Sequence, residues 1–342
     1  MYQRSHTRNQ QGFSIVELMV AITVMLILAG AVFSLMRDSL KVTVATYELT
    51  DAQENLRSSQ EAINRDLFNT GDGLKSISTI LVAPTFVTSY ITRVPVIGSP
   101  LGILTTDNDV PAGTAVPQAS PSATIRTGTD RQTILAVDSA FGNAVTPVSI
   151  DSTGGVVTVT AADLPKFTIG EIYFLTSSVG STFGAITSID VANKKLNFAN
   201  GDSCGINLTG TGGYIKTVSA SGTLATSVQR VRIVHYYVTS TGLLMRRVFG
   251  VKGAAFRDSA VAEHVVNVQF TYYMATTDST GNVVPSMSTT LATSGEQLSV
   301  RQVAVKVTVE TPHALQTGTR QQMSTTTSTS VRNMQFREAL QP

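Results

Sequence analysis

A single carboxylate inside a membrane-length apolar segment is the feature of this sequence that most clearly points to chemistry. The segment runs from Phe13 to Met36, and Glu17 is its only charged residue. A carboxylate costs about 2.5–3.5 kcal/mol near the centre of a bilayer, so such a residue usually has a function and a partner. Positions i and i+4 share one helix face, so we expect Glu17 one turn from Phe13. The positive end of the helix dipole also favours an acid in the first turn.

The other polar residues form no recognisable catalytic set. His6, His235, His264 and His313 have no metal-ligand spacing, and we expect His235 and His264 in strands, with packing or surface roles. The sequence has no P-loop, H-E-x-x-H or G-x-S-x-G motif. We therefore predict that the chain is not an enzyme and that it uses no cofactor or metal.

Two smaller features have modest interpretations. Asp107, Asn108 and Asp109 hint at a calcium loop, because hard cations take several oxygen ligands, but the rest of an EF-hand pattern is missing. We expect a solvated turn there. Cys204 is the only cysteine, so it cannot form an intramolecular disulfide, and we expect a small buried residue or an unused surface thiol.

A group of arginines lies on one predicted hairpin, at Arg230, Arg232, Arg246 and Arg247. A basic patch that contacts DNA is the functional interpretation. Ordinary charges on strand surfaces are the expectation that we prefer.

The apolar segment begins a longer helix. Apolar residues recur at spacings of three, four or seven at Leu49, Ala52, Leu56, Ile63 and Leu67. Polar residues lie between them, at Glu48, Asp51, Gln53, Glu54, Arg57 and Glu61. No proline precedes Pro84, and the segment from Asn69 to Gly73 provides a stop. A helix from Phe13 to Asn69 would be about 85 Å long, with a transmembrane half at 13–36 and an amphipathic half at 37–70.

The rest of the chain, residues 71–342, is expected to form a β-rich head. Residues 74–129 contain six of the eleven prolines, which predicts a long irregular loop region with short strands near Thr79–Val82 and Tyr90–Val96. Further strands are predicted at Gln132–Val137, Gly155–Ala161, Glu171–Thr176, Gly184–Val191, Lys195–Phe198, Gln229–Val238, Leu243–Phe249, Val265–Met274 and Val300–Glu310. Thr239–Gly242 reads as a hairpin turn, and residues 324–330 as a loop or an edge strand. The predicted fold is α+β, a long N-terminal helix packed on a β-rich globular head.

The hexapeptide from Gly12 to Glu17, behind a basic and polar leader, resembles the class III signal of type IV prepilins and related pseudopilins. The resemblance implies that residues 1–12 are a leader peptide, and that a membrane peptidase cuts between Gly12 and Phe13 and methylates Phe13. It also implies that Glu17 pairs with the free amine of a neighbouring subunit during assembly.

An ordinary secretory signal is the alternative interpretation of the N-terminus. Arg4 and Arg8, the apolar core and the segment Ala29–Ala31 fit such a signal, whose cleavage would release a soluble protein that starts near Val32. Such a signal has no use for Glu17, and the helical pattern continues far past Ala31. We therefore prefer the prepilin interpretation.

Charge and composition fit an exported protein that is anchored at its N-terminus. Only 14% of the 342 residues are charged, and the net charge is +2. Loss of the leader removes Arg4 and Arg8, which leaves 23 basic and 23 acidic residues and no global argument for nucleic-acid binding. Because these two arginines precede the apolar segment, we expect a single-pass inner-membrane protein with a cytoplasmic N-terminus and a periplasmic head.

Several short segments are more specifically similar to PilW-like minor pilins, and to the J-type pseudopilins of type II secretion. They are Asn64–Leu67, Thr127–Asp130, Phe167–Glu171, Tyr236–Val238, Gly242–Leu244 with Arg246, Ala262–Val265, Gln269–Tyr273 and Val331–Asn333. The resemblance implies a minor pilin that primes or caps a type IV pilus after processing. The implied partners are the prepilin peptidase and methyltransferase, other major and minor pilins, the inner-membrane assembly platform and membrane lipid. A type II secretion pseudopilin, and a tip adhesin or DNA-binding subunit with loops at 74–129 and 200–225, remain alternatives.

Overall fold

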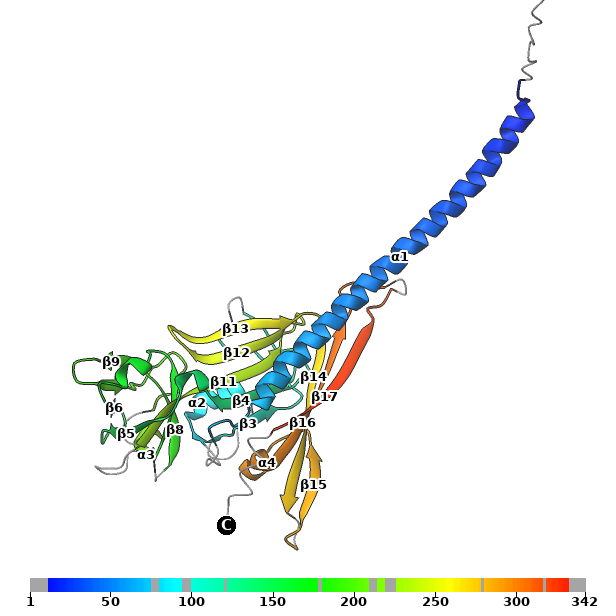
Figure 1. Ribbon diagram of the computed structural model, residues 1–342. Helices are drawn as coiled ribbons and strands as arrows, with labels where there is room; N and C mark the ends of the chain where they lie inside the picture. Colours follow the sequence, from blue (N-terminus) through cyan, green and yellow to red (C-terminus); the bar gives the residue numbers. More distant parts are fainter. Residues whose placement is uncertain are drawn as a thin grey trace, which may run out of the picture.

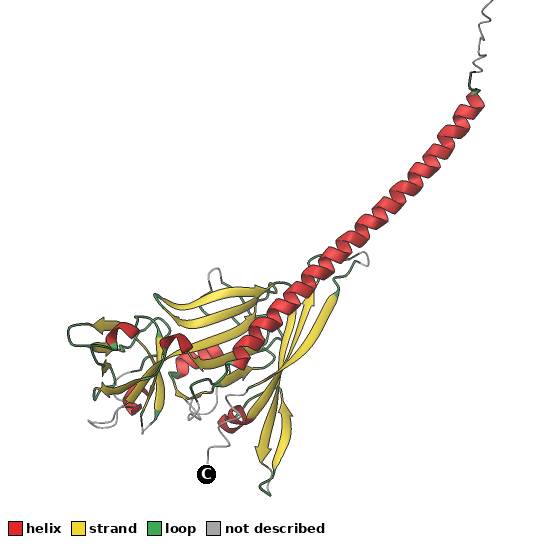
Figure 2. Cartoon of the chain, viewed as in Figure 1, coloured by secondary structure: helices red, strands yellow, loops and turns green. Residues whose placement is uncertain are grey.

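The structure is a computed structural model of the chain, and it describes residues 12–74, 80–93, 100–119, 122–177, 180–208, 214–218, 226–277, 280–315 and 318–331. A long N-terminal helix leaves a β-rich head and runs far beyond it (Figure 1). Strands dominate the head, with only short helices between them (Figure 2). The predicted α+β fold is therefore confirmed.

The long helix, α1, spans Ile15–Phe68. Its 54 residues correspond to about 80 Å at 1.5 Å per residue. Asn69 is the C-cap, and Gly71 follows with a φ of +73°, which glycine adopts without strain. The predicted stop at Asn69–Gly73 is therefore correct.

The second half of α1 packs on the head through the predicted apolar stripe. Ala52, Ile63 and Leu67 are fully buried, and Leu56 packs partly against the same core. The polar residues predicted for the other face are exposed, except for Glu48, which is half-buried. The first half of α1 has no contact with the head and stands bare (Figure 1).

A small antiparallel sheet covers one side of α1, in the order β15-β14-β16-β17. Its strands are β14 (Val265–Thr277), β15 (Val283–Ser288), β16 (Val300–Glu310) and β17 (Gln322–Ser330). The alternation predicted for β16 is confirmed, because Val303, Val305, Val307 and Val309 are all fully buried. Residues 324–330 belong to an edge strand, which decides between the two expectations for that segment.

A second antiparallel sheet forms the middle of the head, in the order β3-β4-β11-β12-β13. Its strands are β3 (Leu104–Asp107), β4 (Arg131–Val137), β11 (Thr226–Val238), β12 (Leu244–Val251) and β13 (Ala254–Ala262). The predicted hairpin turn at Thr239–Gly242 joins β11 to β12.

The N-terminal part of β11 also belongs to a small closed barrel. The other barrel strands are β5 (Val145–Ile150), β6 (Val156–Thr158), β7 (Ile172–Thr176), β8 (Ser181–Ala185), β9 (Ser188–Asp190) and β10 (Lys195–Asn197). Pairing runs from β11 through β5, β6, β10 and β9, and from β8 through β7 back to β11. The ring closes because only Ile186 and Thr187 separate β8 from β9.

The barrel has a hydrophobic core of its own, separate from the main core. Tyr173, Leu196, Phe198 and Val228 are fully buried in it. It lies at the end of the head away from the bare part of α1, to the left in Figure 1. Two very short strands flank it, β1 (Ile80–Leu81), parallel to β8, and β2 (Pro100–Leu101).

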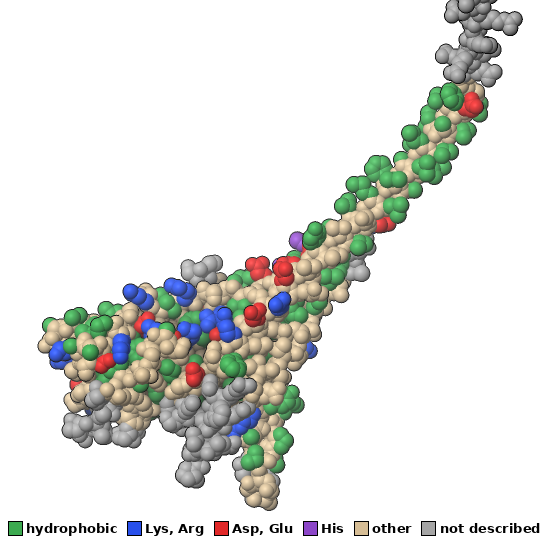
Figure 3. Space-filling view, viewed as in Figure 1, with side chains coloured by type: hydrophobic (Ala, Val, Ile, Leu, Met, Phe, Trp, Pro, Cys, Tyr) green, Lys and Arg blue, Asp and Glu red, His purple; other side chains and the backbone are tan. Residues whose placement is uncertain are grey.

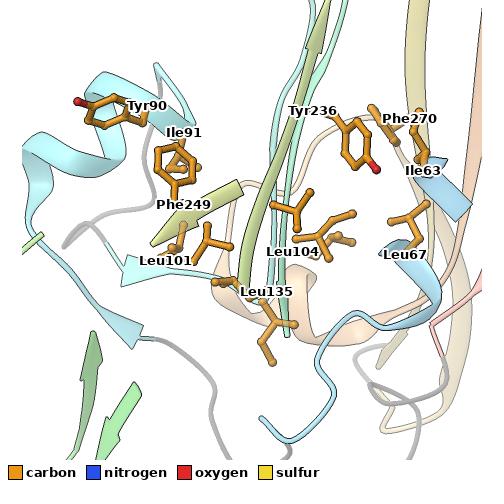
Figure 4. Close-up of a cluster of buried hydrophobic side chains, with 14 of the residues drawn as sticks. Ile63, Leu67, Tyr90, Ile91, Leu101, Leu104, Leu135, Tyr236, Phe249 and Phe270 are labelled. Carbon is orange, nitrogen blue, oxygen red and sulfur yellow. The ribbon is translucent and has the colours of Figure 1, made fainter. Parts of the chain in front are cut away.

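Short helical elements connect the strands. They are α2 (Pro84–Phe86), the π-helical turn η1 (Val87–Ile91), the 3₁₀ turns η2 (Ser139–Phe141) and η3 (Leu164–Lys166), α3 (Tyr214–Val218) and α4 (Ser294–Ser299). The main core joins α1 to both sheets (Figure 4). In it Ile63 and Leu67 of α1 lie near Tyr236 of β11 and Phe270 of β14, while η1 packs around Phe249.

Several predicted strands differ from the structure. The strand predicted at Tyr90–Val96 is wrong, because Tyr90 and Ile91 belong to η1, and residues 94–99 lie outside the described residues. Val87, Tyr90 and Ile91 have the i, i+3, i+4 spacing of a helical face, and all three are buried. The segment predicted as one strand at Gly184–Val191 is two strands.

The region predicted as irregular loop, 74–129, contains α2, η1 and the strands β1, β2 and β3. The strand near Thr79–Val82 exists as β1, with Thr79 outside the described residues. Strands β5, β13 and β15 have no counterpart in the predictions. Each has mixed composition, and the only buried residue in β13 and β15 is Ala262, so neither presents a strong apolar alternation.

Candidate functional site

The N-terminal end of α1 holds the predicted processing residues. Gly12, Phe13 and Ser14 precede the helix, and Phe13 is 89% exposed. A side chain added at Gly12 would meet no atom within 4 Å. This short extended segment is therefore accessible to an enzyme that acts on the backbone between Gly12 and Phe13.

A capping box determines where α1 begins. Ser14 is the N-cap, and its Oγ accepts a hydrogen bond from the backbone N–H of Val16 at 3.1 Å. Oε2 of Glu17 accepts one from the backbone N–H of Ser14 at 3.0 Å. The two side chains thus satisfy backbone donors that a helix start leaves free.

The predicted one-turn relationship between Phe13 and Glu17 is modified by this cap. Phe13 lies outside the helix, so the two residues do not share a helix face in the uncleaved chain. Glu17 instead reaches back to Ser14, the residue next to Phe13. Cleavage before Phe13 would create an amine on Phe13, three bonds from the Ser14 nitrogen whose N–H already donates to this carboxylate.

The helix behind the cap is long and apolar enough to cross a membrane. Its most apolar 18-residue window has a mean hydropathy of 2.6, and none of that window is buried in the head. The hydroxyl of Thr23 donates to the backbone carbonyl of Met19 at 2.7 Å, so this polar group is satisfied inside the helix. Figure 3 shows hydrophobic side chains along the visible face of this part of α1, and its large apolar residues are exposed.

Polar contacts fix the other half of α1 to the head. Asn64 bonds Thr327 and Thr329 of β17, with distances of 3.0 and 2.8 Å. The hydroxyl of Ser58 donates to the carbonyl of Val261 in β13 at 2.9 Å. The helix is therefore held between β13 on one side and β17 on the other.

A buried ion pair completes this attachment. Nε of Arg246 lies 2.6 Å from Oδ2 of Asp66, and the hydroxyl of Tyr236 lies 2.6 Å from the same oxygen. Burial acts against the charge of Arg246 and is the largest single effect, but the hydrogen bonds and charges of Asp66 and Tyr236 together outweigh it and raise the pKa of the guanidinium. Burial, followed by the charge of Asp66, raises the pKa of Tyr236, so its hydroxyl stays protonated.

The predicted basic patch is neutralised by carboxylates. Arg230 pairs with Asp138 and Glu171, and Arg232 also pairs with Asp138. Figure 3 shows red side chains among the blue ones on this face of the head. The arrangement gives no support to the DNA-binding interpretation.

The remaining arginine of the predicted patch is an interior residue. Arg247 is 1% exposed, pairs with Asp258 at 2.8 Å, and lies over the ring of Phe256. The preferred expectation of ordinary strand-surface charges is therefore wrong for Arg247.

The acidic segment at 107–109 serves the fold. Asp107 is 4% exposed and binds Arg93 at 2.9 Å and Arg131 at 2.5 Å. The expected solvated turn is wrong for Asp107, because its carboxylate is buried between two guanidinium groups. Within the described ranges, no group of three or more His, Cys, Asp or Glu side chains could hold a metal ion.

The described histidines take structural positions. His235 is buried in β11, where Nδ1 lies 2.8 Å from the hydroxyl of Thr133, and burial lowers its pKa. His264 is not in a strand as predicted but in the turn between β13 and β14, with a φ of +56°. His313 contacts Glu48 of α1 through its backbone N–H and Nδ1, and these bonds lower the pKa of Glu48. His6 lies outside the described residues, as do Arg4 and Arg8.

Cys204 is buried, which agrees with the first of its two expected roles. Its thiol donates to the carbonyl of Ala255, with a distance of 3.0 Å. Burial raises the pKa of the thiol to about 12, so it remains protonated and unreactive at neutral pH.

Two structurally important carboxylates were missed in the sequence. Asp66 lies in the segment Asn64–Leu67, which stands out in the sequence only for its similarity to minor pilins. Nothing in the helical spacing of Asp66 shows that Arg246 would reach it. Asp130 is 1% exposed. Its carboxylate accepts hydrogen bonds from the backbone N–H of Asp109 at 3.0 Å and from that of Phe270 at 2.8 Å. Burial raises the pKa of Asp130 to about 6.

Comparison with known protein families adds one finding. A model of the prokaryotic N-terminal methylation motif, typical of type IV pilins, matches residues 7–33. The match includes Gly12, Phe13 and Glu17 and the start of α1. Neither the curated proteins nor the solved structures contain a match to this chain.

Proposed function

We propose that this chain, a protein of the type IV pilin-like and pseudopilin class, is a minor pilin that primes or caps a type IV pilus and has no enzymatic activity of its own. The observation that carries the proposal is the combination of the methylation motif with a membrane-length apolar helix segment, none of which is buried in the head. An exposed apolar helix of this kind needs lipid before assembly and other helices afterwards.

The head favours a minor subunit over the repeating subunit of a shaft. It carries an inserted barrel with a separate core at the end remote from the membrane helix. A repeated subunit has to fit many identical neighbours, whereas a subunit at the tip leaves such an extension free. A J-type pseudopilin of a type II secretion system is the alternative role that the sequence resemblance leaves open.

We place the N-terminus in the cytoplasm and the head in the periplasm before assembly. Prepilin peptidase and its methyltransferase would act at Gly12 and Phe13. Glu17 would then pair with a neighbour's amine as the subunit joins the fibre at the inner-membrane assembly platform.

N-terminal mass spectrometry of the chain from sheared surface fibres tests the proposal. A mature chain that starts with N-methyl-Phe13, present at far lower abundance than the shaft subunit, is the expected result. A chain that starts near Val32 would contradict it. Recovery of the processed chain from periplasmic secretion complexes, and not from surface fibres, would favour the pseudopilin role.

A further inference from the structure

Strand β17 has an edge that no described strand occupies. Nine consecutive residue pairs join it to β16 without a register shift, and β17 ends the small sheet. Its sequence, from Gln322 to Ser330, contains no charged residue, proline or glycine. Proteins usually blunt a free edge because its unpaired backbone groups bind other strands.

The other free edges of the described sheets are protected against pairing by a proline, by charged residues or by short length. β15 contains Pro285, which lacks a backbone N–H, and β13 contains Arg257 and Asp258. β2 is only two residues long and β3 only four. Among the described strands, β17 is the long edge without any of these devices.

Two hydrogen bonds that flank the strand show which backbone groups are free. The N–H of Thr311 donates to the carbonyl of Gln321, and that of Val331 to the carbonyl of Arg301, both at 2.9 Å. These bonds continue the register of β16 and β17, in which bonded and non-bonded pairs alternate. The odd-numbered residues of β17 therefore face β16, and the backbone groups of the even-numbered residues point outward, at Ser324, Thr326 and Ser328.

A charged stripe on α1 runs beside this edge. Asn64 of α1 contacts Thr327 and Thr329, and Arg57 and Glu61 lie seven and three residues earlier on the same stripe. Both are exposed. They are about 6 Å apart along the helix, close to the spacing of about 6.8 Å between alternate residues of a strand. Two successive same-face side chains of an added strand would match this pair.

We propose that the free edge of β17 binds an extended strand of a neighbouring fibre subunit, with an acidic residue facing Arg57 and a basic residue two positions away facing Glu61. Addition of a strand to a sheet edge supplies affinity through backbone bonds and specificity through alternate side chains. The inference rests on the proposed function for the premise that both subunits are anchored in one membrane.

Because both subunits are anchored in one membrane, the added strand cannot belong to a second copy of this chain that pairs antiparallel along β17. β17 runs in the same direction as α1, because the segment just before it contacts Glu48 through His313, and its later residues contact Asn64. Two copies paired antiparallel along β17 would therefore point their membrane helices in opposite directions. They could not both enter the same membrane from the same side.

Residue-resolved hydrogen exchange provides the test. The full-length chain in detergent micelles is compared with the same chain in fibres sheared from its native cells. We expect the N–H groups of Ser324, Thr326 and Ser328 to exchange about tenfold more slowly, or slower still, in the fibres. Those of Thr325 and Thr327 are protected by β16 in both samples and act as an internal control. Unchanged exchange at the three outward groups in fibres would overturn the proposal.

A matched pair of variants tests the same edge by assembly. Thr326→Pro removes an outward N–H without a loss of pairing to β16, whereas Thr326→Ala keeps that N–H. We expect Thr326→Pro to reduce recovery in fibres about tenfold and Thr326→Ala to leave it unchanged, with equal thermal unfolding of the two purified chains. Equal recovery of both variants would contradict the proposal.

Two further outcomes point to other causes. Protection of the outward groups in micelles that rises with protein concentration would show pairing between copies and would overturn the choice of partner. Absence of the wild-type chain from sheared fibres would contradict the proposed function itself, and with it the premise of this inference.

Discussion

The hydroxyl oxygen of Tyr236 lies 2.6 Å from Oδ2 of Asp66, and this contact joins strand β11 to the last turns of α1. Arg246 of β12 binds both oxygens of the same carboxylate, at 2.6 and 3.2 Å. Asp66 is 7% exposed, so the charge of Arg246 is balanced largely out of water. The long helix is thus tied to the head by this buried polar contact in its last turn, and not only along its apolar stripe.

The Asp66 ion pair is expected to be needed for stability. In Asp66→Asn, Arg246 would remain mostly buried without a carboxylate, and removal of one partner of a buried pair costs about 3–5 kcal/mol. We expect a loss of about 3 kcal/mol in the free energy of unfolding, measured by urea denaturation of the full chain in detergent. Arg65→Gln changes an exposed residue of the same turn and should cost less than about 0.5 kcal/mol. Equal stability of the two variants would refute the role of Asp66.

Asp130 should make the head less stable as the pH rises. Burial raises its pKa from 3.8 to about 6 in the folded chain, so between these values the folded state binds more protons than the unfolded state. The stability from protonated Asp130 is fully present below pH 3.8 and is lost as the pH rises to about 6. The difference approaches about 3 kcal/mol.

Urea unfolding at pH 4 and pH 7 measures this effect. Asp130→Asn removes the titratable group. Its amide N–H₂ would also face one of the two backbone N–H groups that now donate to the carboxylate, so one hydrogen bond would be lost. We expect this variant to be less stable at pH 4 and to lack the wild-type decrease between pH 4 and pH 7. Glu54→Gln, on the exposed face of α1, should preserve that decrease. A decrease that persists in Asp130→Asn would assign it to another group.

Local patterns in the sequence predicted α1 and the strongest strands, because both depend on spacing within one segment. The alternating valines of β16 and the stripe at Ala52, Ile63 and Leu67 are of this kind. The Asp66 and Arg246 pair joins residues 180 positions apart, and no local spacing contains that information. Tyr90 and Ile91 resembled a strand in composition, but their burial against Phe249 favours a helical turn. The barrel was missed as a unit because its closure depends on pairings among several short strands.

Gly154 should be essential for the docking of α3 on the barrel. A Cβ at this position would lie 2.4 Å from the backbone nitrogen of Lys216, and the φ of +73° disfavours other residues. Gly201 has a similar φ of +83° but no atom within 4 Å of an added Cβ. We expect Gly201→Ala to cost about 1 kcal/mol from backbone strain alone, and Gly154→Ala to cost about 2–4 kcal/mol. Urea unfolding compares the two variants, and equal costs would show that α3 does not constrain this position.

Gly12→Arg should block processing without any effect on folding. No atom lies within 4 Å of a Cβ at Gly12, so the head and α1 tolerate the change, and the expected defect lies in recognition by the peptidase. We expect the variant to stay in the membrane at the mass of the full-length chain, as measured by intact-mass spectrometry. Gly30→Ala, which is equally open but lies inside α1, should be cleaved normally. Normal cleavage of Gly12→Arg would place the processing site elsewhere.

Glu17 has two separable roles, because its carboxylate caps the backbone N–H of Ser14 and also carries a charge. Glu17→Gln keeps an oxygen that can accept this N–H but removes the charge, whereas Glu17→Ala removes both. If Glu17 pairs with the amine of a neighbouring subunit, both variants should be cleaved and methylated at Phe13, yet both should be recovered in sheared fibres at less than about a tenth of the wild-type level. The loss is expected because an unpaired ammonium group in lipid costs about 2.5–3.5 kcal/mol, which is more than a factor of ten in the assembly equilibrium. Normal assembly of Glu17→Gln combined with failure of Glu17→Ala would show instead that the carboxylate acts as a helix cap, and that the charge is not needed for assembly.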